Sequence, residues 1–197
     1  HTITYKCGSA SGTIATKSSS TSISWTPQLA LAQQNTTGSS VSITLTITTY
    51  SGDTSVGSNS YTVTCSIPAS VKPTVSMNLS DDAGYLSTFG KYIQGMSKVK
   101  VSLTASGNQG STIKSYKVVV DGRTYGSSSF TTNVISGSGL LTVEAAVTDS
   151  RGRTATTSTA ITVAEYAKPK FTSLSVKRSD SSGNPSSSGA YLAVRFS

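Results

Sequence analysis

The sequence predicts an all-β chain of tandem immunoglobulin-like β-sandwiches, and three observations lead to this prediction. Ser and Thr make up 70 of the 197 residues, yet Val, Ile and Leu recur among them at every second position, as in half-buried strands. Turn-forming Gly, Asp and Asn separate these runs. Finally, residues 71–76 (VKPTVS) are echoed by residues 167–172 (AKPKFT), a period of about 96 residues that suits one immunoglobulin-like domain.

The two Lys-Pro pairs of this echo mark the expected joints between modules. Pro73 and Pro169 each follow an alternating run, and proline ends a strand because it cannot donate to a ladder. We therefore expect modules at 1–71 and 72–164, and the N-terminal piece of a third at 165–197. Two strands cannot bury a core alone, so this piece is expected to fray or to lean on a neighbour. The chain starts without Met and stops inside a predicted strand, which we interpret as an internal segment of a longer protein.

The first module is expected to contain five strands and one helical turn. The alternating runs predict strands at residues 2–6, 13–17, 22–25, 41–47 and 59–67. A helical turn is predicted at 29–34. Trp25, the only tryptophan, is predicted to anchor the core together with the apolar odd positions of 41–47. The alternative is an exposed Trp25 that stacks on a sugar.

The second module repeats this plan. Strands are predicted at residues 74–79, 99–105, 113–120, 140–148 and 154–163. Asp121 and Gly122 form a hairpin signal that requires positive φ, and residues 149–152 (DSRG) are predicted to turn between the last two strands. In the third piece, residues 180–189 are expected to form a long flexible loop because of their Ser, Gly, Asn and Pro content.

The two cysteines are Cys7 and Cys65. With Trp25 between them they have the Cys-Trp-Cys order of an antibody domain, but Cys65 lies in the last strand before the joint and no Tyr stands two residues ahead of it. We expect two buried free thiols, as in a protein assembled in a reducing cytoplasm. A disulfide is the alternative.

No constellation of residues predicts catalysis or metal binding. His1 is the only histidine and stands at an end of the chain, whereas a nucleophilic site needs a rigidly placed base. Asp81 and Asp82 are neighbours on an extended chain and point apart, and with Asp180 they fall short of an EF-hand calcium loop. The remaining aspartates occupy turn positions, where Asp caps its own backbone: Asp53, Asp121 and Asp149. We predict no enzymatic activity, no metal site and no cofactor.

The net charge of +8 is uneven, with +1 in residues 1–71, +4 in 72–164 and +3 in 165–197. Scattered lysines are typical of the solvated face of a sheet, and the alternative is attraction to a polyanion such as a phosphate-rich wall polymer. No basic cluster is interleaved with aromatics, so nucleic acid is not expected. No stretch of about 18 apolar residues predicts a membrane span.

The ligand-binding candidates are three aromatics of a Gly-rich stretch and two lysines beside it: Tyr85, Phe89, Tyr92, Lys98 and Lys100. The alternative is that the aromatics plug an open end of the sandwich and that the lysines are merely solvated.

Several short motifs, taken in order, resemble a known family. They are residues 12–15 (GTIA), 24–27 (SWTP), 48–52 (TTYSG), 67–73 (IPASVKP), 95–101 (GMSKVKV), 113–116 (IKSY) and 148–154 (TDSRGRT). Together they resemble a minor structural protein family of tailed phages that infect Gram-positive bacteria. The resemblance implies a receptor-binding-associated tail-tip or tail-fibre component with tandem immunoglobulin-like modules, no enzymatic activity and no universal binding residue. The cysteines are not part of this pattern.

We therefore expect a non-enzymatic structural or adhesion segment of a phage tail protein, acting as a spacer or in host-surface recognition during adsorption. It would be assembled in the host cytoplasm and located in the tail of the virion. Its expected partners are other tail proteins, and host cell-wall polysaccharide or teichoic acid. The alternative is the stalk of a bacterial surface adhesin, or a carbohydrate-binding module of a cell-wall hydrolase.

Overall fold

The computed structural model describes all of residues 1–197, which form two compact units, 1–164 and 165–197. Strands hold 53% of the residues and helices 6%, which confirms the all-β class. None of the helices is long and apolar enough to cross a membrane.

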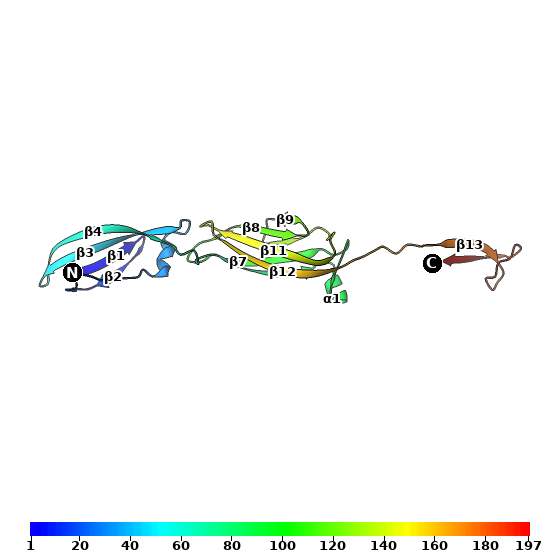
Figure 1. Cartoon of the computed structure of the whole chain (residues 1–197), viewed down its shortest axis with the longest axis horizontal. Coiled ribbons are helices and arrows are strands. Elements are labelled where there is room, and N and C mark those ends of the chain that lie inside the picture. Colours follow the sequence, from blue (N-terminus) through cyan, green and yellow to red (C-terminus); the bar gives the residue numbers. More distant parts are fainter. The chain divides into compact units, whose positions relative to one another are not determined.

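The first part of unit 1 is a single antiparallel sheet in the order β2-β1-β3-β4 (Figure 1). Its strands are β1 (Thr2–Cys7), β2 (Ala10–Ala15), β3 (Ser40–Ser51) and β4 (Thr54–Ser66). The predicted helical turn is present as the 3₁₀ helix η1 (Leu29–Gln34). A first apolar cluster joins sheet and helix: Cys7, Leu31, Ala32, Val41, Ile43, Ile67 and Val71. One face of this sheet is therefore covered by η1 and its flanking chain rather than by a second sheet.

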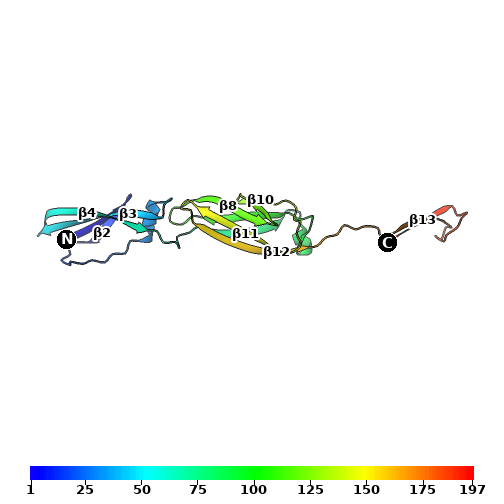
Figure 2. The ribbon, with the colours of Figure 1, turned by 45° about the horizontal axis from the view of Figure 1, so that its top comes forward.

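The strand predicted at 22–25 is absent, and the chain there forms a loop (Figure 2). Serine side chains in this loop form hydrogen bonds with residues two positions away. Ser20 N–H donates to Ser18 Oγ (3.1 Å), and Ser20 Oγ donates to the carbonyl of Ser22 (2.6 Å). Such local bonds compete with a strand ladder. Trp25 is half-buried and stacks on Tyr5, with ring centroids 4.8 Å apart. It thus packs on the edge of the first cluster and is not fully buried.

The second part of unit 1 is a two-sheet sandwich, with sheets β10-β7-β5 and β6-β12-β11-β8-β9. Its strands are β5 (Thr74–Asp81), β6 (Tyr92–Ile93), β7 (Val99–Ser106), β8 (Ile113–Val120), β9 (Arg123–Tyr125), β10 (Ser129–Thr131), β11 (Gly139–Asp149) and β12 (Thr154–Ala164), and α1 (Tyr85–Phe89) follows β5. All five predicted strands are present. Alternate residues of both sheets, such as Val99, Val118 and Val143, are fully buried in a second cluster, because successive side chains of a strand point to opposite faces.

The two apolar clusters lie on either side of residues 71–73. Val71 belongs to the first cluster, Pro73 is fully buried, and Met77 packs against the second cluster. The module boundary after residue 71 stays a prediction. Pro169 is exposed in a stretch without strands.

Unit 2 is a two-stranded antiparallel hairpin of β13 (Leu174–Ser179) and β14 (Tyr191–Phe196). The large apolar side chains of these two strands remain exposed, from 54% for Val176 to 67% for Leu192, so the hairpin buries no core of its own, as expected. The loop between the strands is organised by Asp180, whose carboxylate accepts the N–H groups of Ser182 and Asn184 (both 2.9 Å). The bonds from Asn184 are the main reason that the pKa of Asp180 lies below its ordinary value.

Candidate functional site

The turn between β11 and β12 is the polar feature that joins the two parts of unit 1. Asp149 is fully buried, and its Oδ1 accepts the backbone N–H groups of Arg151 and Arg153, both at 2.9 Å. Gly152 between them has a φ of +77°, which favours glycine. The carboxylate therefore fixes the backbone from which both arginine side chains project. We call Asp149, Ser150, Arg151 and Arg153 the arginine clasp.

The guanidinium of Arg151 bridges the two parts of unit 1. On one side it donates to the carbonyls of Ala32 (2.9 Å) and Asn35 (2.9 and 3.1 Å) at the end of η1, where the Ala32 carbonyl also accepts the N–H of Asn35 (3.1 Å). On the other side it donates to the carbonyls of Asn108 (2.7 Å) and Gln109 (2.6 Å), in the loop between β7 and β8. A cation at a helix C-terminus is also favoured by the helix dipole.

The charge of Arg151 is kept despite its partial burial. Burial lowers the pKa of Arg151, Asp149 raises it and Arg153 lowers it again. Arginine does not deprotonate in proteins, so the guanidinium donates as a cation, and charge-assisted bonds are stronger than neutral ones.

Arg153 and Ser150 complete the clasp. Arg153 donates to the carbonyls of Ile67 (2.7 Å) and Val71 (2.5 Å), in the chain that leaves β4. Ser150 Oγ donates to the carbonyl of Thr36 (2.5 Å). The clasp therefore holds both the end of η1 and the connection into β5.

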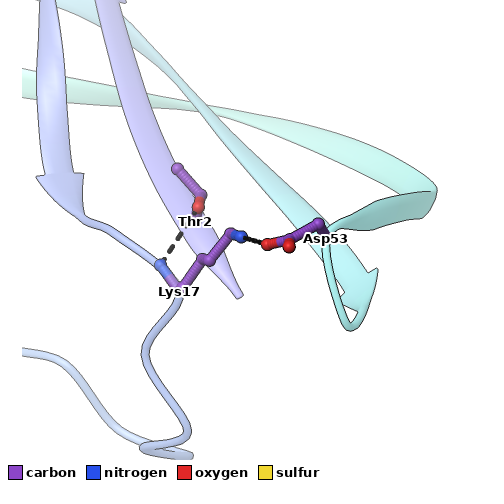
Figure 3. Close-up of polar contacts among 3 residues, drawn as sticks. All are labelled: Thr2, Lys17 and Asp53. Carbon is purple, nitrogen blue, oxygen red and sulfur yellow. Dashed lines mark hydrogen bonds and ion pairs between the residues drawn. The ribbon is translucent and has the colours of Figure 1, made fainter.

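A second polar contact fastens the loop that follows β2 (Figure 3). Lys17 pairs with Asp53 in the β3–β4 turn, and its N–H donates to Thr2 Oγ1 (3.1 Å). Its ammonium also lies 5.7 Å from the ring centroid of Tyr50. Because both charged side chains are largely exposed, the pair contributes at most about 1 kcal/mol.

The predicted ligand-binding residues do not form one site. The prediction that Tyr92 contacts a ligand is wrong. Its side chain is only 3% exposed and belongs to the second cluster, so no ligand reaches it. Tyr85 and Phe89 stack on each other within α1, with centroids 6.4 Å apart. Lys98 and Lys100 are exposed because the valines next to them fill the core.

A shallow depression of about 400 Å³ lies on the outer face of β8, β11 and β12. Its lining residues are Lys117, Val119, Glu144, Ala145, Ala146, Thr156, Thr157 and Ser158. None of them is aromatic, so the depression lacks the flat apolar surface on which a sugar ring stacks. No group of three or more His, Cys, Asp or Glu residues is placed to hold a metal ion.

The cysteines are both free, and the sheet order explains why. Cys7 lies on β1 and Cys65 on β4, with β3 between them, and Cys65 is also offset along the strands because it pairs with Val41. Their Cα atoms are therefore more than two strand spacings, or more than about 9.5 Å, apart. A disulfide needs less than about 7 Å. Burial, and secondarily the nearby Cys65, raises the pKa of Cys7.

We therefore expect purified protein to titrate two thiols under mild denaturation without reductant, with Cys65 reacting before the buried Cys7. A thiol reagent followed by intact-mass measurement checks this. A native mass lower by two hydrogens, with no thiol titrated, would contradict it.

Acid should destabilise unit 1 through Asp121. Burial acts to raise the pKa of Asp121, but hydrogen bonds from Ser136 N–H (2.7 Å), Ser136 Oγ (2.8 Å) and Gly137 N–H (3.1 Å), with help from Arg123, outweigh it, so the pKa is lowered. A lowered folded-state pKa stabilises the fold above the unfolded pKa of about 3.9, and this stabilisation is lost as pH falls through the folded value. Asp121→Asn should flatten the fall in melting temperature below about pH 4. An unchanged pH profile would exclude this role.

Comparison with known proteins places the chain in a viral family. No curated protein matches it. Among solved structures, the fibronectin(III)-like modules of CbhA from Clostridium thermocellum are similar at 16% identity, covering 65% of this chain and 87% of theirs, with a low TM-score of 0.36. The family model described as "Siphovirus protein of unknown function (DUF859)" matches residues 1–186. The chain therefore belongs to this family of siphovirus proteins.

Proposed function

We propose that residues 1–164 act as a stiff, non-enzymatic spacer in the tail of the virion, which keeps a host-recognition element at a set distance. The observation that carries this proposal is the arginine clasp. Five hydrogen bonds from Arg151 and two from Arg153 end on backbone carbonyls on both sides of the joint.

The clasp makes bending at residues 71–73 costly. Domains joined by a short linker usually move relative to each other unless their interface is large. Hydrogen bonds to charged groups contribute about 1.5–3 kcal/mol each, so even a partial loss on bending outweighs thermal energy. Pro73 removes further freedom, since proline has a fixed φ.

The location is tested on particles. Gradient-purified virions should contain the protein, and antibodies against residues 1–164 should label the tail in electron micrographs. Antibodies against the capsid serve as the matched control for labelling. Absence from purified virions, with the protein present in the infected-cell lysate, would contradict the proposal.

Direct contact with the host wall is a second candidate, supported by the charge of +8. Lys98 directly precedes β7 and Lys100 lies on it, whereas Lys114 and Lys117 lie on β8 of the other sheet. All four lysines are exposed. Because the charges are spread over both sheets, binding to teichoic acid should be weak and should fall steeply with salt.

Sedimentation with intact walls and with walls stripped of teichoic acid, at low and high salt, checks this second candidate. Binding to intact walls that disappears at high salt or on stripping is expected. Tight binding that salt does not weaken would instead indicate a preformed sugar site.

A further inference from the structure

Strand β4 is an open edge of the first sheet, and its one protection is a register shift where Gly57 and Ser55 pair with Thr49 and Tyr50. It is 13 residues long, and its residues Thr54–Thr62 are exposed on both faces. Edge strands are normally short, charged or interrupted by proline, because unpaired N–H and C=O groups invite another strand. Residues 54–66 (TSVGSNSYTVTCS) contain no Asp, Glu, Lys, Arg or Pro.

Four of the other five edge strands of unit 1 follow the usual rule. β6, β9 and β10 have two or three residues. β2 has six residues and, like β4, carries no charge and no proline. β5 has eight residues, follows Lys72 and Pro73 and ends in Asp81. β4 is therefore the longest edge strand of unit 1 without a charge or a proline in it.

The same hairpin also leaves apolar surface uncovered. Tyr61 lies opposite Leu45 and is 73% exposed, and Ile47, further along the same face of β3, is 40% exposed. Ile43, by contrast, is fully buried under the cover that η1 supplies. Ile47 was expected to face the core, and it remains exposed because this cover ends before it.

We propose that β4 pairs in antiparallel fashion with β4 of a second copy of this chain, which joins two four-stranded sheets into one. In a two-fold interface each residue near the axis meets its own copy, so a charged strand would repel itself. β4 has no charge to repel. When odd positions oppose odd positions, Tyr61, Val63 and Cys65 of both copies lie on one continuous apolar face.

The opposite face of β4 suits this pairing as well. Thr62 and Ser60 share hydrogen bonds with Thr44 (3.0 Å) and Thr46 (2.8 Å) on β3. Small hydroxyl side chains neither block nor repel an approaching strand, and pairs of hydroxyl side chains across two strands stabilise a sheet.

The test is sedimentation velocity on the full chain. The average mass should rise toward twice 20.2 kDa as the concentration increases from about 10 µM to about 500 µM, the range of a weak interface. Ser60→Lys/Thr62→Lys should keep the protein monomeric. The control Thr44→Lys/Thr46→Lys breaks the same hydroxyl pairs on the inner strand β3, and it should still dimerise.

Two further measurements keep the test decisive. Amide hydrogen exchange of the wild type should slow in β4 at high concentration and stay unchanged in β2. This measurement needs no variant, so it remains valid even if a lysine variant unfolds. Val176→Ser/Val194→Ser removes apolar surface from the unit 2 hairpin and should leave dimerisation intact. A monomer at every concentration, dimers that survive the β4 lysines, or dimers lost only with the hairpin variant would each overturn the proposal.

Discussion

Arg151→Ala should separate the unfolding of the first sheet from that of the sandwich. The change removes every bond that the guanidinium makes to Ala32, Asn35, Asn108 and Gln109. The carbonyls of Ala32 and Asn108 keep other donors, whereas the partly buried carbonyls of Asn35 and Gln109 lose theirs. We expect a loss of about 3 kcal/mol, since an unsatisfied buried polar group costs about 1–3 kcal/mol. Trp25, the only tryptophan, reports on the first sheet by fluorescence, while circular dichroism reports on all strands.

In the wild type the two signals should share one urea midpoint, as coupled modules do. In Arg151→Ala the fluorescence midpoint should fall by about 1 M or more and move away from the dichroism midpoint. Arg151→Lys should recover only a small part, because an ammonium cannot reproduce the planar fork of donors. Lys114→Ala, an exposed lysine on β8, is the matched control. Coincident midpoints in Arg151→Ala would mean that the clasp does not couple the modules.

Asp149→Ala should also lower the free energy of unfolding by about 3 kcal/mol, but for a different reason. It removes the acceptor of two backbone N–H groups at a fully buried position, and each unsatisfied donor costs about 1–3 kcal/mol. It also removes the negative charge near Arg151. Thermal unfolding followed by circular dichroism measures the loss.

Asp149→Asn keeps an oxygen for the same two donors, so it should retain more stability than Asp149→Ala. Asp82→Ala, at an exposed position, should be neutral within about 0.5 kcal/mol. Equal losses for Asp149→Ala and Asp82→Ala would show that the carboxylate does not organise the turn.

Local patterns predicted most of the strands well. The period-two run located β8 at 113–120, and the helical turn predicted at 29–34 coincides with η1. The Asp121-Gly122 turn has the positive φ values that it was expected to need, +49° and +71°. These features depend on residues near one another in the sequence. The strand expected at 22–25 did not form. Alternation of apolar and polar residues is a local pattern, and it does not supply the partner strand that a ladder needs.

The clasp could not be predicted, because its partners are distant in the sequence. The DSRG run was correctly interpreted as a turn, but Arg151 and Ala32 are 119 residues apart, and backbone carbonyls carry no residue signature. The one sequence feature that points to the clasp is an Asp close to two arginines in a predicted turn. The candidate Tyr92 failed because a strand of only two residues, β6, places it in the core.

Residual dipolar couplings measured on the amides of unit 1 test the central claim most directly, which is that the two parts move as one body. One alignment tensor should fit the couplings from β1–β4 and from β5–β12 in the wild type, and two different tensors should be needed in Arg151→Ala. Two tensors of different magnitude in the wild type would contradict a stiff spacer.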